Sequence, residues 1–370
     1  MIKADEINMK LSLFSRFCLF LTIFIFCSEV LNAAPRYCRK KIREKPEVLL
    51  PANFENRWGF IDEEGQYFIE PYYEKAFDFS EGLALVELDG KWGFIDERGR
   101  EVIEPQSVYL MHSFSCGKAL FCKNRKYGFY DLEGETAVQA QFELASDFSE
   151  NLAAVKIGGS WGYIDQTGGL VIKNQFALAG DFHQGLAWVL SNGKFGYLDQ
   201  SGVSVVEPCY EFAGDFSEDL AVVRADRIYK FIDKTGLIVL DFQYEDARGF
   251  SDGLAAVEMD GKWGFINKKG DFEISPRFDG VKTGFCGGLA GVKIGDRYGF
   301  IDKRGKVIVE PHFQDLEPFR NGFARVSYGI KSGYIEKTEK NTWTIHRIPG
   351  YPRWGYYSEF YHQQKKPGEI

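Results

Sequence analysis

A tandem repeat of 34 or 35 residues constrains this chain more than any other feature of its sequence. An aromatic residue followed by glycine recurs along the chain, and successive second positions lie 34, 35, 34, 34, 34, 34, 35 and 34 residues apart. A period held over nine copies is typical of proteins in which each unit packs on its neighbours. The nine copies, two of them degenerate, are Trp58-Gly59, Trp92-Gly93, Tyr127-Gly128, Trp161-Gly162, Phe195-Gly196, Tyr229-Lys230, Trp263-Gly264, Tyr298-Gly299 and Ser332-Gly333.

Each copy predicts three short antiparallel strands. In residues 83–105 a first strand leads to Asp89-Gly90, a two-residue loop that favours the turns with positive φ found between paired strands. The second strand, Lys-Trp-Gly-Phe-Ile-Asp, ends at a four-residue turn with Asp96 first and Gly99 last. This spacing indicates a type I turn closed by a left-handed glycine. We expect the third strand to end at Pro105, because proline has no N–H for the ladder.

A second motif, Phe-Ser-Glu-Gly-Leu-Ala and its variants, keeps step with the first and predicts the loop that leads to the next unit. It begins at Phe79 in its clearest copy. Because both faces of the strands are apolar, each unit must be covered by its neighbours. We expect this Phe to cross the repeat boundary and fill the space that Gly93 leaves between two aromatics.

The motifs together resemble the WG (or KWG) repeat family of bacterial proteins. The residues that carry the resemblance are Trp-Gly-Phe-Ile-Asp, a glycine three residues later, Val-Ile-Glu-Pro and Phe-Ser-Glu-Gly-Leu-Ala, repeated from residue 53 to residue 348. The resemblance implies a short β-strand repeat that often occurs on exported or surface proteins. It implies no enzymatic activity and supplies no catalytic, cofactor-binding or metal-binding residues.

The repeat therefore predicts an all-β protein: a tandem array of about nine three-stranded β-meanders. We expect an open, solenoid-like array. The alternative is a closed β-propeller, but propellers typically have 4–8 blades of four strands each, and 34 residues are few for such a blade.

The N-terminal residues 1–34 predict a signal peptide or a short membrane anchor. Lys10 and Arg16 precede an apolar run, and the small residues Ala33 and Ala34 follow it. The acidic residues Asp5 and Glu6 do not suit such a leader, so translation could start at Met1 or at Met9. We expect export to the periplasm, cell surface or medium; the alternative is a protein anchored to the membrane by an uncleaved leader.

Three further segments follow the leader. Residues 35–46 form a basic linker, residues 47–348 the repeat domain, and residues 349–370 an aromatic and then polar C-terminal cap or tail. Five cysteines remain after the leader, an odd number at unrelated repeat positions, which does not predict a disulfide framework. A bridge between Cys116 and Cys122 is the one pairing that export would favour.

The shared polar and aromatic residues have structural interpretations that we favour over chemical ones. The Asp at the head of each four-residue turn caps that turn, because one carboxylate per unit cannot supply the 6–8 oxygens that Ca²⁺ takes. The Trp residues exchange with Tyr and Phe between copies, which favours packing over sugar stacking. The carboxylates are Asp62, Asp96, Asp131, Asp165, Asp199, Asp233 and Asp302; the tryptophans are Trp58, Trp92, Trp161 and Trp263; the histidines, without metal spacing, are His112, His183, His312, His346 and His362.

These observations predict an exported, non-enzymatic WG-repeat protein that acts as a scaffold for a protein or a cell-envelope component. The alternatives are a glycan-binding protein and a propeller-type glycosidase with two carboxylates in a central channel. A net charge of −8 argues against nucleic acid as a partner. No catalytic, cofactor or metal residue is predicted, and a functional site is expected among the residues that the copies do not share.

Overall fold

The computed structural model describes residues 44–329, 331–337 and 343–347. The chain divides into two compact units, Met1–Lys45 and Pro46–Ile370, and the description below concerns the second. Every regular element in the described residues is a β-strand. These residues contain no helix long and apolar enough to cross a membrane. The predicted leader and the C-terminal tail lie outside the described residues.

The strands form nine small antiparallel sheets, called blades here and numbered in chain order. Blade 1 has three strands within the described residues, and each of the others has four. Blades 1 to 3 are β1 (Leu50–Phe54), β2 (Arg57–Ile61), β3 (Tyr67–Tyr73); β4 (Lys75–Ser80), β5 (Leu83–Leu88), β6 (Lys91–Asp96), β7 (Glu101–Gln106); and β8 (Leu110–Met111), β9 (Ala119–Lys123), β10 (Lys126–Tyr130), β11 (Thr136–Phe142).

Blades 4 to 6 are β12 (Leu144–Ala145), β13 (Ala153–Ile157), β14 (Ser160–Ile164), β15 (Leu170–Phe176); β16 (Leu178–Ala179), β17 (Leu186–Ser191), β18 (Lys194–Asp199), β19 (Ser204–Tyr210); and β20 (Phe212–Ala213), β21 (Leu220–Ala225), β22 (Ile228–Asp233), β23 (Ile238–Tyr244). Blades 7 to 9 are β24 (Asp246–Ala247), β25 (Ala255–Met259), β26 (Lys262–Ile266), β27 (Phe272–Phe278); β28 (Gly280–Val281), β29 (Leu289–Ile294), β30 (Arg297–Asp302), β31 (Val307–Phe313); and β32 (Asp315–Leu316), β33 (Phe323–Tyr328), β34 (Lys331–Lys337), β35 (Trp343–Arg347).

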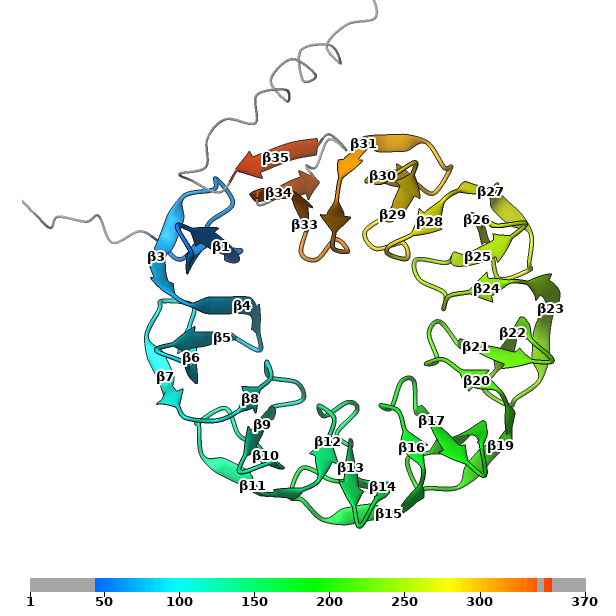
Figure 1. Ribbon diagram of the computed structural model, residues 1–370, viewed down its shortest axis with the longest axis horizontal. Coiled ribbons are helices and arrows are strands. Elements are labelled where there is room, and N and C mark those ends of the chain that lie inside the picture. The colour runs from blue at the N-terminus through cyan, green and yellow to red at the C-terminus, as the bar shows by residue number, and fades with distance from the viewer. Residues whose placement is uncertain (1–43, 330, 338–342, 348–370) are drawn as a thin grey trace, which may run out of the picture. The chain divides into compact units, whose positions relative to one another are not determined.

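The blades stand side by side around a central opening and make a closed ring, a nine-bladed β-propeller (Figure 1). The first strand of a four-stranded blade lies next to the opening and the fourth lies at the circumference. The expected three-stranded unit was therefore incomplete. The segment expected to be a return loop contains the inner strand, which in most blades has only two residues, such as β12. That brevity lets a 34-residue repeat hold four strands.

The glycine of each Trp-Gly pair allows the outer strand to approach, as in blade 2. A Cβ on Gly93 would lie 2.6 Å from the carbonyl oxygen of Ile103 and 2.9 Å from the nitrogen of Pro105. The pairing register of β6 and β7 shifts at the same place, so the outer strand bulges toward Gly93. The expectation that the Phe of the Phe-Ser-Glu-Gly motif fills this space was wrong, because the same blade's backbone occupies it. The expectation that this Phe packs across the repeat boundary is confirmed, as at Phe114 on Phe94. The strand also continues past Pro105 to Gln106, so proline marks the bulge rather than the strand end.

The hydrophobic core lies between blades, as a row of separate clusters. One cluster joins Leu120, Phe129 and Val138 of blade 3 to Phe148 and Ala153 of blade 4. Burying two apolar faces in this way satisfies the pattern seen in the sequence. The repeat therefore works as predicted, with each unit covering its neighbour.

The ring is closed, so the main expectation of an open array was wrong. Leu50, Ala52 and Ile61 of blade 1 share a buried cluster with Phe323 and Tyr334 of blade 9. In addition, the Tyr334 hydroxyl donates a hydrogen bond to the Pro51 carbonyl oxygen, 2.6 Å away and 283 residues distant in the sequence. The contact between blades 9 and 1 is called the closing junction below.

Candidate functional site

The Phe-Ser segment that follows the inner strand joins each blade to the one before it, and we call it the corner. At eight junctions its Phe packs on the aromatic ring two residues after the Trp position of the preceding blade, with centroids 4.7–5.1 Å apart. Such pairs add about 0.5–1.5 kcal/mol each beyond the area that they bury. The pairs are Phe60–Phe79, Phe94–Phe114, Phe129–Phe148, Tyr163–Phe182, Tyr197–Phe216, Phe231–Phe250, Phe265–Phe285 and Phe300–Phe319.

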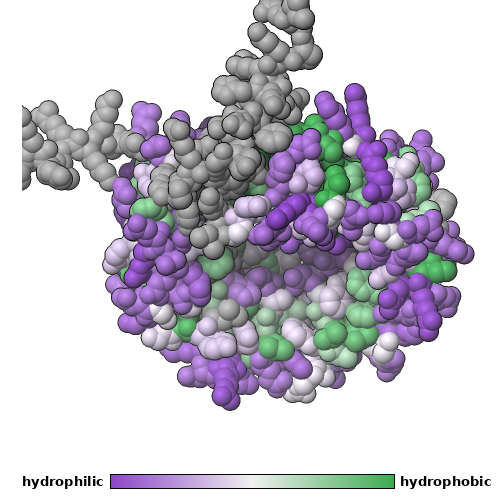
Figure 2. Space-filling model, turned by 45° about the horizontal axis from the view of Figure 1, so that its top comes forward, coloured by the Kyte–Doolittle hydropathy of each residue, from purple (hydrophilic) through white to green (hydrophobic). Residues whose placement is uncertain are grey.

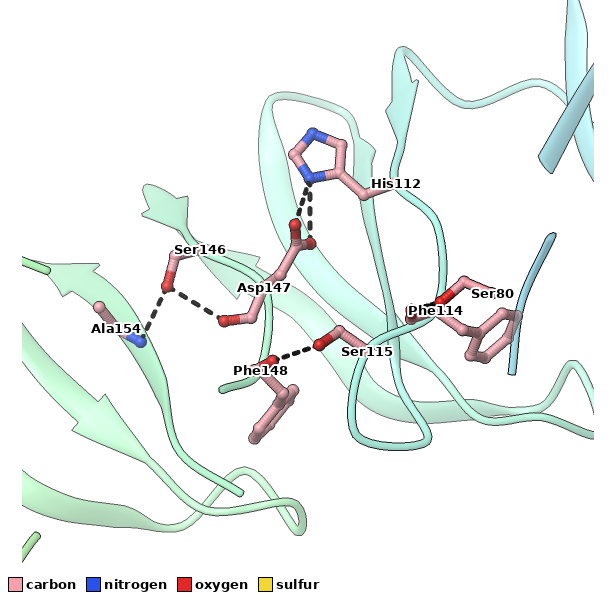
Figure 3. Close-up of polar contacts among 8 residues, drawn as sticks. All are labelled: Ser80, His112, Phe114, Ser115, Ser146, Asp147, Phe148 and Ala154. Atoms are coloured by element: carbon pink, nitrogen blue, oxygen red, sulfur yellow. Dashed lines mark hydrogen bonds and ion pairs between the residues drawn. The ribbon is translucent and has the colours of Figure 1, made fainter. Parts of the chain in front are cut away.

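The polar residues of the corner also bind the next blade (Figure 3). Ser80 Oγ donates to the Phe114 carbonyl oxygen and Ser115 Oγ to that of Phe148, both over 2.7 Å. The following side chain accepts a backbone N–H from the next corner, as Glu150 does from Gly185 over 2.8 Å. The residues that the corners share thus have structural roles.

The carboxylates at the head of the four-residue turns lie where the sequence predicted. Asp199 Oδ1 accepts the N–H groups of Ser201 and Val203 over 2.9 and 3.0 Å within its own turn. Hydrogen bonds, first from the Ser201 hydroxyl and then from the Val203 N–H, hold the pKa of Asp199 below its usual value. The prediction that these residues cap turns is confirmed.

The tryptophans of the Trp-Gly pairs are less buried than predicted. Trp263 is 7% exposed, whereas Trp58, Trp92 and Trp161 are only partly buried. Cations cover several of these rings: Lys75 Nζ lies 5.0 Å from the centroid of Trp92, and the Arg248 guanidinium lies 5.3 Å from that of Trp263. The prediction of core packing therefore holds fully for Trp263 alone among the four.

Polar side chains gather on blades 3 to 6, beside the inner strands. An Asp stands directly before the corner Phe in blades 4 to 6, as in blade 2, whereas the histidines and the tryptophan of this group depart from the repeat. The group is called the polar arc, and its residues come from consecutive corners near the central opening (Figure 1). A hollow lies at the centre of the face in Figure 2, inside a mostly hydrophilic rim. The polar arc consists of His112, Ser146, Asp147, Asp181, His183, Trp188 and Asp215.

One end of the polar arc is a contact between blades 3 and 4 (Figure 3). His112 Nδ1 lies 3.0 and 3.1 Å from the two carboxylate oxygens of Asp147, and both side chains are about two-fifths exposed. This hydrogen bond is the main cause that raises the pKa of His112, and burial partly opposes it. The imidazole is thereby favoured in its charged form.

The other end of the polar arc joins blades 5 and 6 through Asp215. Its Oδ1 accepts the indole N–H of Trp188 over 3.0 Å, and its Oδ2 lies 3.6 Å from His183 Nε2. Gly180 makes room for this indole, because a Cβ there would overlap the ring of Trp188. Trp188 departs from the repeat, whereas Gly180 recurs in the next copy as Gly214.

Asp181 lies between these two ends in the sequence, and its carboxyl group has a raised pKa. Burial is the main cause that raises its pKa, and the charges of Asp147 and Asp215 add to it. A hydrogen bond with Ser146 and the charge of His183 act in the opposite direction. Three carboxyl groups from consecutive blades thus create a negative potential that a cationic group would relieve.

Other sequence candidates do not join a site. Within the described residues no group of three or more His, Cys, Asp or Glu side chains could hold a metal ion. Cys116 and Cys122 are both free thiols, so the bridge considered for them does not form. Cys38 and His362 lie outside the described residues.

The chain belongs to the family described as WG containing repeat. The family model matches eight repeats, at residues 58–92, 92–127, 127–161, 161–195, 195–226, 231–263, 263–298 and 298–329. The protein is thus a WG-repeat β-propeller. No curated protein sequence matches the chain at a significant level.

Solved structures that resemble the chain share its fold. A crystal structure of a eukaryotic initiation factor aligns with a TM-score of 0.57 at 12% identity, covering 83% of this chain and 95% of that one. PorZ of Porphyromonas gingivalis, titled a bacterial surface component of a secretion system, aligns with a TM-score of 0.35 at 12% identity. The alignment covers 75% of this chain and 45% of PorZ. Hsv2p of Kluyveromyces lactis aligns with a TM-score of 0.40 at 9% identity, covering 73% of this chain and 96% of that one. Only the first similarity supports an argument, and it concerns the fold.

Sequence reasoning missed the polar arc. His112 stands two residues before a corner Phe and His183 one residue after another, so no repeat column brings them together. Trp188 replaces small or aliphatic residues such as Ala154 and Val222 of neighbouring blades. The available signal was an Asp directly before the corner Phe in three consecutive copies, with unusual residues near it, but its meaning required the ring.

Proposed function

We propose that the protein is an exported, non-enzymatic scaffold that binds a partner protein through the polar arc. The observation that carries the proposal is that three carboxylates, two histidines and a tryptophan gather on four consecutive blades beside the central hollow. The three carboxylates share one repeat position, but the side chains that they contact, His112, His183 and Trp188, depart from the repeat. Propeller folds serve many functions, and the fold alone therefore names none.

The chemistry of the polar arc favours a cationic group on the partner. Asp147, Asp181 and Asp215 supply carboxylates, and Trp188 and His183 border the last of them. A Lys or Arg side chain would relieve the repulsion among these carboxylates and form charge-assisted hydrogen bonds. Trp188 offers an indole at which an Arg guanidinium could stack.

The test uses an acetylated Gly-Arg-Gly amide as probe, measured by NMR titration of the full chain. We expect the triple variant Asp147→Asn, Asp181→Asn, Asp215→Asn to bind it about tenfold more weakly. The matched control, Asp89→Asn, Asp226→Asn, Asp260→Asn, changes the net charge equally at turn positions where φ is 50–52° and Asn is tolerated. Equal weakening by both variants, or no binding by the wild type, would refute the proposal.

Export is the second part of the proposal and rests on the leader of residues 1–34. N-terminal sequencing of the native protein after cell fractionation tests it. We expect a mature chain that begins close to Pro35, recovered outside the cytoplasm. A cytoplasmic chain that begins at Met1 or Met9 would refute this part and leave the binding proposal untouched.

Glycan hydrolysis is a second candidate, favoured by the raised pKa of Asp181 beside Asp147 and Asp215. Glycosidases use a pair of carboxyl groups in which one has a raised pKa and acts as the general acid. Release of reducing ends from an oligosaccharide panel tests it, with Asp181→Asn as the inactive control. Hydrolysis by the wild type alone would favour this function over the scaffold.

A further inference from the structure

A cavity of about 520 Å³ lies at the closing junction. Its lining comes from the corner of blade 9, from residues 46–50 leading into blade 1, and from the corner of blade 2. This is the size range of pockets that bind small ligands or single side chains with their backbone. Among the lining residues are Leu50, Arg320, Asn321, Arg325 and Tyr334.

The cavity lies beside the place that a corner Phe fills elsewhere, where Val48 packs on the buried cluster of Leu50 and Tyr334. At the junction of blades 3 and 4, Phe148 packs against Leu120, Phe129 and Ala153, and is 1% exposed. The repeat register places Arg325 at the position of Leu120, Tyr334 at that of Phe129, and Leu50 at that of Ala153. All three line the cavity.

The first copy has no corner Phe of its own. At the four corner positions the sequence reads Lys-Pro-Glu-Val, residues 45–48, where the next copy reads Phe-Ser-Glu-Gly. Tyr334 therefore has no corner ring from blade 1 to pack on, although its hydroxyl donates a hydrogen bond to the Pro51 carbonyl. The closing junction thus combines an aromatic wall with a missing aromatic partner.

The corner of blade 9 also offers polar groups that other corners use between blades. Arg320 stands at the position of Ser115, which donates to a Phe carbonyl. Asn321 stands at the position of Glu150, which accepts a backbone N–H. In blade 9 these positions face the cavity, where the backbone of an inserted peptide would present a carbonyl and an N–H.

The charge of the lining adds a preference. Glu47, Asp78, Glu97 and Glu317 supply four carboxylates, against the two guanidinium groups of Arg320 and Arg325. One of these guanidinium groups is already engaged: Arg325 lies 3.8 Å from a Glu317 oxygen and covers the Trp58 ring at 5.0 Å. A ligand with a positive charge beside its aromatic group is therefore favoured.

We propose that this cavity is a second binding site, which takes a peptide segment of a partner protein carrying Phe or Tyr next to Lys or Arg. The aromatic ring enters the cavity beside Tyr334, the peptide carbonyl faces Arg320, and the N–H faces Asn321. This mode resembles strand complementation, in which a foreign segment supplies an element that the fold leaves out. The site is separate from the polar arc and does not depend on the function proposed for it.

The test is calorimetric titration of the full chain with an acetylated Phe-Arg-Asn-Gly amide, the sequence of the chain's own ninth corner. We expect Ala-Arg-Asn-Gly and Phe-Glu-Asn-Gly to bind at least about tenfold more weakly, because they lack the ring and the positive charge. The polar-arc triple variant should keep the affinity of the wild type, which separates this site from the other one.

A matched pair of variants locates the site. Asn321→Gly removes the accepting amide, and Cys116→Gly makes the same change at the corresponding position of blade 3; both residues have φ near 50°. We expect Asn321→Gly to weaken binding about fivefold to tenfold and Cys116→Gly to leave it unchanged. Equal affinity for the Phe and Ala peptides, or equal effects of the two variants, would overturn the proposal. A dimer of the chain that the peptide dissociates would assign the cavity to a second copy and also overturn it.

Discussion

The regular junction of blades 4 and 5 can be compared with the closing junction of blades 9 and 1. In both, the first blade of the pair supplies a tyrosine from the same repeat position. Tyr163 and Tyr334 both donate a hydrogen bond to a backbone carbonyl of the next blade, over 2.8 and 2.6 Å. Tyr163 also carries the ring of Phe182, which is fully buried, whereas Tyr334 borders a cavity. The two joints thus differ in the corner of the following copy, which begins with Phe182 at the filled joint and reads Lys-Pro-Glu-Val at the joint that borders the cavity.

The largest loss of stability is expected when the corner ring is removed from a regular junction. Phe182→Ala removes a fully buried ring between blades 4 and 5, and we expect the free energy of unfolding to fall by about 3–5 kcal/mol. Guanidinium denaturation followed by circular dichroism measures this change. A loss below about 1 kcal/mol would mean that the corner ring matters little to joining blades, and the distinction between the joints would fail.

A smaller effect is expected from the closing hydrogen bond. Burial raises the pKa of Tyr334, so its hydroxyl stays protonated and remains a donor well above neutral pH. Tyr334→Phe leaves the Pro51 carbonyl without this donor, which we expect to cost about 1–3 kcal/mol. Hydrogen exchange of residues 50–54 should speed up in this variant.

The matched control is Tyr163→Phe, which removes the equivalent hydroxyl where Phe182 still packs. We expect exchange near β16 to change less than exchange near β1 does in the other variant. The reverse order would show that the closing junction is not the weaker joint.

The corner serine should contribute less still. Ser149→Ala removes the hydrogen bond to the Phe182 carbonyl oxygen, 2.7 Å long, and we expect a loss of about 0.5–1.5 kcal/mol in the free energy of unfolding. Arg320→Ala changes the corresponding position of blade 9, and we expect almost no loss there. Equal losses in thermal or chemical denaturation would contradict this difference.

The smallest effect is the pH dependence of the joint between blades 3 and 4. Asp147 raises the pKa of His112 in the folded chain, so the contact stabilises fully below the unfolded pKa of about 6.5 and fades as pH rises through the higher folded value. Because both side chains are partly exposed, we expect less than about 1 kcal/mol. The free energies of unfolding of the wild type and of His112→Gln, measured by denaturation from pH 5 to 8, should converge toward pH 8. A difference between them that stays constant with pH would refute the stabilising role of the protonated His112.

The sequence allowed the strands, turns and contacts between neighbours to be predicted, because those depend on residues close in the chain. Asp96 and Gly99 mark a turn wherever they stand, and the 34-residue period fixes which units touch. Closure could not be predicted in the same way, because it depends on the angle between successive blades and on a contact between Pro51 and Tyr334. The inner strands escaped notice since two residues carry no periodic pattern.

The candidate sites were the least predictable part. His112, Asp147 and Trp188 look unrelated along the chain, and only the ring brings consecutive corners to one opening. The cavity at the closing junction had a faint signal, the Lys-Pro-Glu-Val of residues 45–48 in place of a Phe-Ser corner. In an open array this difference would mark a terminal cap, whereas in a closed ring it leaves a cavity.

The most direct test of the closed ring is the distance between blades 1 and 9. Spin labels at positions 57 and 328, both exposed, can be introduced into a chain whose native cysteines are replaced, and measured by double electron–electron resonance. A closed ring makes these blades neighbours, so we expect a separation of about one or two sheet spacings of ~10 Å. An open array would place eight such spacings between them, and a distribution centred near ~80 Å would contradict the ring.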